Sequence, residues 1–274
     1  MDDNELKELE LRLFLEGVYE RYGYDFREYA PASLSRRVWK CIGDEKLGTI
    51  SGLQERVLHD PACMKRFLNT MAVEVTAMFR DPGFYAAFRK TVVSHLRTHP
   101  YMRIWHAGCA SGEEVYSLAI LLKEEGLYDA ARIYATDMNG EVLQRAETGI
   151  YPLKAMKDHT ASYLEAGGRE EFANYYVARY DNAIFDRCLQ KNIVWSQHNL
   201  ASDGSFKEFH VIICRNVMIY FSRPLQNRVH DLFYDSLNLS GVLGLGSKES
   251  LKFTPHESDY EVLDAKQKLF RRIK

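Results

Sequence analysis

Apolar residues recur at a spacing of three to five positions through the first part of the chain. Leu6, Leu9, Leu13 and Val18 follow this spacing, and no convincing strand pattern interrupts it over residues 1–80. A spacing near 3.6 residues places side chains on one face of an α-helix. The pattern therefore predicts an all-helical N-terminal domain over residues 1–80.

After residue 100 the hydrophobic period changes. Apolar runs at 102–108 and 131–138 are typical of buried strands, and helical patterns follow them at 112–127 and 141–148. Further strands are expected at 192–200, 209–216 and 241–247, with a helix at 224–237. This alternation favours an α/β domain over residues 81–274, with a parallel sheet covered by helices.

Two segments depart from the alternation. Residues 260–274 hold two strand-like runs around a polar turn, which predicts a closing antiparallel hairpin. Residues of about 165–192 include the runs YYVARYD and AIFDRCLQ, which indicate a small inserted antiparallel β subdomain. A closing hairpin distinguishes this sheet from that of a nucleotide-binding dehydrogenase.

Composition limits the partners and the cellular location that we expect for this protein. The 274 residues carry a formal charge of only −2, so no nucleic-acid partner is indicated. No run approaches the length of a membrane span, and the acidic start MDDNELKELE is unlike a signal peptide. We therefore expect a cytoplasmic protein without membrane insertion.

The five cysteines are scattered, with no C-x-x-C pair and no clustered histidines. They are interpreted as reduced, buried thiols, and no metal is expected. A local excess of positive charge over residues 36–66 could meet an acidic partner or form an ordinary solvated surface. Its members are Arg36, Arg37, Lys40, Lys65 and Arg66.

The turn after the first strand is the candidate ligand site, because open α/β sheets bind ligands at the carboxyl ends of their strands. Gly108 and Gly112 allow close backbone approach, but the G-x-G-x-x-G fingerprint is absent. Glu113 and Glu114 disfavour a pyrophosphate and favour a cationic ligand such as a sulfonium. They could equally complement only the helix dipole.

Asp137 lies at the end of the second predicted strand. An acid at this point can accept hydrogen bonds from both hydroxyls of a ribose, although a turn or cap residue is the commoner role. The glycine turn and the strand-end acid together indicate an adenosine-containing ligand.

Around these residues the sequence resembles the CheR family of chemotaxis-receptor methyltransferases along nearly the whole chain. Six ordered segments carry the resemblance: VTAMFRD (75–81), WHAGCASGEEVYSLAILL (105–122), ATDMNGEVLQRAETGIY (135–151), QHNL (197–200), IICRNVMIYF (212–221) and LGSKESL (245–251). The resemblance implies a Rossmann-like class I methyltransferase sheet closed by a hairpin. It also implies transfer of a methyl group from S-adenosylmethionine to glutamate side chains in the cytoplasmic helical domain of chemoreceptors.

The resemblance also implies site residues. Arg80 and Tyr220 would be catalytic, although from the sequence alone Arg80 could close a helix end and Tyr220 could pack in the core. The cofactor-binding residues would be Thr76, Arg80, Ala107, Gly108, Gly112, Glu114, Asp137, Met138, Asn199, Leu200, Arg215 and Asn216.

Two positions and one segment depart from the family pattern. Glu74 replaces a common Asn, Lys248 replaces a smaller or aromatic polar residue, and residues 180–192 lack the glycine-rich loop of members that bind a receptor-tail pentapeptide. We therefore expect recognition without such a tail. A nicotinamide-dependent oxidoreductase lacks its phosphate-binding turn here, and a noncatalytic binding module is disfavoured by the retained site residues.

Overall fold

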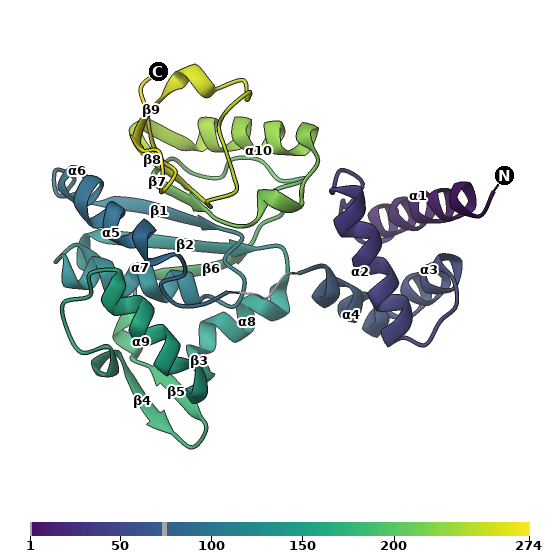
Figure 1. Cartoon of the computed structure of the whole chain (residues 1–274), viewed down its shortest axis with the longest axis horizontal. Coiled ribbons are helices and arrows are strands. Elements are labelled where there is room, and N and C mark those ends of the chain that lie inside the picture. Colours follow the sequence, from purple (N-terminus) through teal and green to yellow (C-terminus); the bar gives the residue numbers. More distant parts are fainter. Residues whose placement is uncertain (1, 73–75) are drawn as a thin grey trace. The chain divides into compact units, whose positions relative to one another are not determined.

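The chain divides into two compact units in the computed structural model, which describes residues 2–72 and 76–274 (Figure 1). The first unit holds the described residues up to 72, together with Asn199–Asp203 and Tyr220–Val229. The second unit holds the rest of the described residues. Glu74, one of the departures from the family pattern, lies outside the described residues.

Helices dominate the first unit, as the hydrophobic spacing predicts. They are α1 (Asp3–Tyr22), α2 (Pro31–Asp44), α3 (Ile50–His59) and α4 (Pro61–Met71). Asp2 caps α1 by accepting hydrogen bonds from the backbone N–H groups of Asn4 and Glu5. Proline begins both α2 and α4, where its missing N–H leaves no helix hydrogen bond unmade.

Three aromatic rings form the centre of this unit. The Phe67 ring makes edge-to-face contacts with Phe14 and Phe26, at centroid separations of 5.0 and 5.7 Å. Leu6 and Leu13 belong to the periodic pattern but are 41% and 50% exposed. The pattern therefore predicted the helix correctly and its buried face only in part.

The helical pattern ends earlier than residue 80. Helix α4 stops at Met71, and residues 76–80 are not helical. Phe79 and Asp81 adopt left-handed φ angles of 53° and 54°. The backbone N–H of Phe79 donates to Ser117 Oγ at 2.8 Å instead of to a helix carbonyl. A side-chain acceptor far along the sequence, which local periodicity cannot register, thus shapes this segment.

A seven-stranded sheet in the order β6-β2-β1-β7-β8-β10-β9 forms the second unit, and only β10 runs antiparallel to the others. Its strands are β1 (Met102–Ala107), β2 (Ala131–Asp137), β6 (Ile193–Gln197), β7 (Phe209–Cys214), β8 (Leu237–Leu245), β9 (Tyr260–Asp264) and β10 (Leu269–Arg272). The expected parallel sheet and closing hairpin are confirmed, and this is the class I methyltransferase arrangement.

Helices accompany this sheet. They are α5 (Pro82–Thr91), α6 (Val93–Leu96), α7 (Glu113–Glu124), α8 (Gly140–Thr148), α9 (Met156–Glu165) and α10 (Arg223–Ser236). The residues of α10 alone among these helices are divided between the two units. No helix in the described ranges is long and apolar enough to cross a bilayer.

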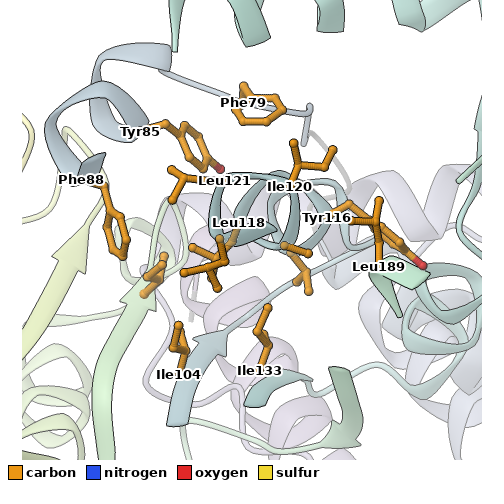
Figure 2. Packing of buried hydrophobic residues seen from close by; sticks show 14 of the residues in the cluster. Phe79, Tyr85, Phe88, Ile104, Tyr116, Leu118, Ile120, Leu121, Ile133 and Leu189 are labelled. Atoms are coloured by element: carbon orange, nitrogen blue, oxygen red, sulfur yellow. The ribbon is translucent and has the colours of Figure 1, made fainter. Parts of the chain in front are cut away.

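Helix α7 is buried on more than one side. Figure 2 shows Ile104 and Ile133 of the sheet below it, and Phe79 and Tyr85 on the opposite side. Every residue from Glu114 to Leu122 is buried. A helix enclosed in this way has little freedom to shift, so it gives a fixed base to the turn that precedes it.

A second, three-stranded sheet has the order β3-β5-β4, and α9 lies near it (Figure 1). Its strands are β3 (Ile150–Pro152), β4 (Tyr176–Arg179) and β5 (Asn182–Phe185), joined in antiparallel pairs. Strand β3 precedes the range of about 165–192 expected for the insertion. With three residues it is too short to give an alternating pattern.

Buried acids at the end of α7 join it to its neighbours. Glu124 accepts hydrogen bonds from the hydroxyls of Tyr163 and Tyr175 and pairs with Arg89. Arg89 also pairs with Glu125 at 2.9 Å. Burial opposes ionisation of Glu124, but these donors together lower its pKa.

Glu124→Gln is expected to destabilise the protein by about 1.5–3 kcal/mol, because Arg89 and two tyrosine hydroxyls lose a charged acceptor while Glu125 still pairs with Arg89. Exposed Glu165→Gln should change stability by less than about 0.5 kcal/mol. Because the folded-state pKa of Glu124 is lowered, its contribution exists above the unfolded value of about 4.3 and disappears as the pH falls through the folded value. Urea unfolding at several pH values measures both effects, and equal losses in the two variants would contradict this prediction.

Candidate functional site

The turn between β1 and α7 depends on glycine. Gly108 has a φ of +70°, and the N–H groups of Gly108 and Cys109 both donate to the Thr136 carbonyl, at 2.8 and 2.9 Å. A Cβ atom on Gly108 would lie 2.5 Å from Val217 Cγ2. Conformation and space therefore both exclude a larger residue, because the Val217 side chain occupies the position that a Cβ atom would take.

Asp137 ends β2 and holds the same turn. Its Oδ2 accepts the N–H of Ala110 and its Oδ1 accepts the N–H of Asn139, both at 3.0 Å. The turn role anticipated as an alternative is therefore present. The ribose role that the sequence suggested for Asp137 stays a prediction.

Arg215, after β7, joins three other parts of the second unit. It is 4% exposed. Its Nη1 donates to the Arg80 carbonyl at 3.0 Å and to Glu114, and its Nη2 donates to Asp81 Oδ2 at 2.6 Å. Its guanidinium lies 4.3 Å from the centre of the Phe84 ring. One side chain thus fixes the segment before α5 to the start of α7 and the end of β7.

The electrostatics of this cluster follow from burial. Burial raises the pKa of Glu114, while the charge of Arg215 opposes the shift. His106, whose Nε2 lies 3.9 Å from Glu114, has its pKa lowered to about 3 by burial and by Arg215. The sequence suggested that Glu114 would face a cationic ligand; here its carboxylate already has Arg215 as a cationic partner.

Glu249, after β8, anchors the neighbouring turn. Its two oxygens accept the backbone N–H groups of Gly246, Asn216, Val217 and Met218, at 2.6–3.1 Å. Burial raises the pKa of Glu249, and these four donors act in the opposite direction. A single carboxyl group therefore fixes the turn that carries Asn216.

Several features of this edge fit a nucleoside. Asn216 Oδ1 is buried without a hydrogen-bond partner among the described residues, so it can accept from a ligand N–H or O–H. Asp137 stands at the end of β2, the position where a carboxylate can accept hydrogen bonds from ribose hydroxyls. These acceptors lie near the carboxyl ends of β2 and β7, the edge where open α/β sheets bind ligands, and their role toward an adenosine ligand stays a prediction.

The remaining expected residues fall in both units. In the second unit, Ala107 ends β1 and is buried, and Thr76 is half-buried. Gly112 has a φ of +88°. The backbone carbonyl of Met138 accepts a hydrogen bond from the Gln197 side chain at 3.4 Å. Asn199, Leu200 and Tyr220 belong to the first unit, where Asn199 Oδ1 accepts the Ala201 N–H at 3.0 Å. Their proposed roles at the site stay predictions.

Three residues near this edge were not predicted from the sequence to belong to the site. Asp81 and Tyr85 interact with the Arg215–Glu114 pair, and Glu249 fixes the Asn216 turn. Glu249 follows a predicted strand, as Asp137 does, so its position was a usable signal. Asp81 and Tyr85 follow no predicted strand, and only the fold places them beside Arg215.

Both parts of the chain match family models. The model for the CheR methyltransferase SAM-binding domain matches residues 74–269, and the model for the CheR methyltransferase all-alpha domain matches residues 9–72. Together they cover the N-terminal helical region and the α/β region described above.

Full-length relatives show the same likeness. The protein named Cher3 of Pseudomonas putida is 46% identical over 97% of both chains. A chemotaxis protein methyltransferase of Listeria innocua is 28% identical, covering 87% of this chain and 88% of that one. A chemotaxis protein methyltransferase of Salmonella typhimurium is 27% identical, covering 89% and 85%.

Arg215→Met is expected to destabilise the protein by about 3–5 kcal/mol, because it leaves the buried Glu114 without its cation. Adding Glu114→Gln to that variant should recover part of the loss, since the unpaired charge is removed. Exposed Arg187→Met serves as the control. Thermal and urea unfolding measure the series, and strictly additive losses would show that the two side chains do not act as a pair.

Proposed function

The chain belongs to the CheR family of S-adenosylmethionine-dependent methyltransferases, and we propose that it methylates glutamate side chains of chemoreceptors, forming methyl esters for sensory adaptation. The observation that carries this proposal is the match to both CheR regions, together with relatives named chemotaxis protein methyltransferase. The proposed substrate is the cytoplasmic helical domain of a receptor, and the proposed location of the enzyme is the cytoplasm.

Methyl transfer to a carboxylate needs no general base. A glutamate side chain with a pKa of about 4.3 is ionised at pH 7. S-adenosylmethionine, when bound, supplies a methyl group on a positively charged sulfur. The carboxylate oxygen forms a bond to the methyl carbon as the carbon–sulfur bond breaks, and the electron pair of that bond stays on sulfur. The protein therefore has to orient the two reactants rather than move a proton.

The residues proposed for this task have separate roles. The glycine turn, Asp137 and Asn216 would hold the nucleoside. Arg80 would grip a carboxylate through its planar donors, and Tyr220 would donate a hydrogen bond to the acceptor. Because Arg215 uses the backbone carbonyl of Arg80, the Arg80 side chain is not needed for that contact.

The direct test incubates the protein with radiolabelled S-adenosylmethionine and membranes of its own host. Base-labile label on a receptor-sized band is expected, because methyl esters hydrolyse in base. Cofactor binding by calorimetry without any transfer would instead favour a noncatalytic binding module. Omission of the membranes is the control for label on the enzyme itself.

Arg80→Ala should lower the rate of methyl transfer by about a hundredfold or more while leaving thermal unfolding nearly unchanged. The reason is that the substitution removes the guanidinium but keeps the carbonyl that Arg215 binds. Arg187→Met is the matched surface control. Transfer at the wild-type rate by the folded Arg80→Ala protein would remove Arg80 from the mechanism.

We further propose that the receptor is recognised without a C-terminal pentapeptide. In the inserted subdomain only Tyr180 and Asp181 connect β4 to β5, and this connection lacks glycine. Family members that bind such a tail carry a glycine-rich loop in the corresponding region. The two-residue connection supports a different mode of recognition.

The basic residues of the first unit are a weaker docking surface than the sequence suggested. Arg37 is 7% exposed, Lys40 pairs with Asp44 at 2.6 Å, and Arg66 pairs with Glu45. Arg36 and Lys65 are the other two members of the group. Recognition of an acidic receptor surface by this unit stays a prediction. The burial of Arg37 and the ion pairs of Lys40 and Arg66 weaken the support that these basic residues give to it.

Titration of the protein with the family's aromatic-acidic pentapeptide should give no binding tighter than about 1 mM, equivalent to about −4 kcal/mol. Isothermal calorimetry measures this, with S-adenosylhomocysteine as the positive control for active protein. Saturable micromolar binding of the peptide would contradict tail independence.

A further inference from the structure

The segment that carries Tyr220 is fixed to the first unit by its backbone. Ala30 N–H donates to the Tyr220 carbonyl at 2.8 Å, and Ser222 N–H donates to the Glu28 carbonyl at 2.9 Å. Between them Tyr29 and Phe221 form an antiparallel bridge, with ring centroids 5.0 Å apart. The main chain at Tyr220 is thus held by the residues that lead into α2.

Arg37 lies in α2 and holds the side chain of Tyr220 in the same unit. Its guanidinium carbon is 4.4 Å from the centre of the Tyr220 ring. Its Nη1 donates to the Met71 carbonyl at 2.5 Å, which fixes the guanidinium plane from the end of α4. Backbone and ring of Tyr220 are therefore both restrained by the helical unit.

The charge of Arg37 is unusual for its position. The side chain is 7% exposed, has no ion pair with any described residue, and keeps a buried Nη2 without a hydrogen-bond partner. Burial lowers its pKa, and the neighbouring Tyr220 and Tyr29 act in the opposite direction. A buried cation without an acid is rare in protein interiors, and the aromatic ring is the group that its face meets.

We propose that Arg37 is a positioning residue for methyl transfer and acts through Tyr220. Stacking of the guanidinium limits rotation of the phenol ring, so the hydroxyl keeps one direction for its hydrogen bond to the acceptor carboxylate. The nearby positive charge also polarises the phenol and strengthens that donor. This inference rests on the proposed function, since it assigns Tyr220 a part in that reaction.

The kinetic test uses the full-length protein, host membranes as acceptor and radiolabelled S-adenosylmethionine at varied concentration. Arg37→Met should lower kcat about ten- to a hundredfold, with the KM for S-adenosylmethionine changed by less than about twofold. Arg37→Lys should restore part of kcat, because an ammonium can also lie over the ring. Exposed Arg12→Met, which removes a charge from the same unit, is the control.

A double-variant cycle separates positioning from a structural role. In a Tyr220→Phe background the hydroxyl is absent, so Arg37→Met should change kcat by less than about twofold. The same large loss in both backgrounds would overturn the proposal. If Arg37→Met fails to fold, Arg37→Gln and Arg37→Lys carry the same comparison.

A second measurement does not depend on activity. With 3-fluorotyrosine incorporated, the ¹⁹F signal of Tyr220 is assigned by its loss in Tyr220→Phe. Arg37→Met should shift this signal and narrow it through faster ring motion, and an unchanged signal would overturn the inference. If the wild type methylates no receptor, the proposed function fails, while the ¹⁹F comparison still decides whether Arg37 holds the ring.

Discussion

Arg215 with its two acids is the interaction on which the candidate site depends. A buried guanidinium is stable only if its charge and most of its donors are satisfied, and Glu114, Asp81 and the Arg80 carbonyl meet that demand. These partners come from the start of α7 and from the segment before α5. Satisfying one side chain therefore fixes the relative positions of segments more than a hundred residues apart in the sequence, and it does so beside the glycine turn.

Carboxyl groups bound to backbone N–H groups complete this edge of the sheet. Asp137 holds the turn after β1, and Glu249 holds the turn after β7. Each replaces hydrogen bonds that a strand can no longer supply once it has ended. Asp137, which the sequence indicated for ligand binding, thus also builds a loop at this edge, so a substitution there is expected to affect structure and binding together.

The sequence predicted the strands of the main sheet and helices α7, α8 and α10 because their hydrophobic periods are regular, and it predicted the glycine turn because few residues tolerate a φ like that of Gly108. It did not predict the path of residues 76–80, where the N–H of Phe79 is bound by Ser117. Nor did it reveal that Arg37 is buried against Tyr220 and is not part of a basic surface. Both depend on contacts between distant segments, which no local pattern records. The proposed methyl acceptor rests on family resemblance and not on residue pattern.

We propose that the edge formed by the glycine turn, Asp137 and Asn216 binds the methyl donor while the Arg215 cluster stays intact. A crystal structure of the complex with S-adenosylhomocysteine tests this most directly. We expect the nucleoside against Gly108 and Asp137, a ligand donor on Asn216 Oδ1, and unchanged Arg215 contacts to Glu114 and Asp81. Ligand density elsewhere, or release of Arg215 from its acids on binding, would contradict it.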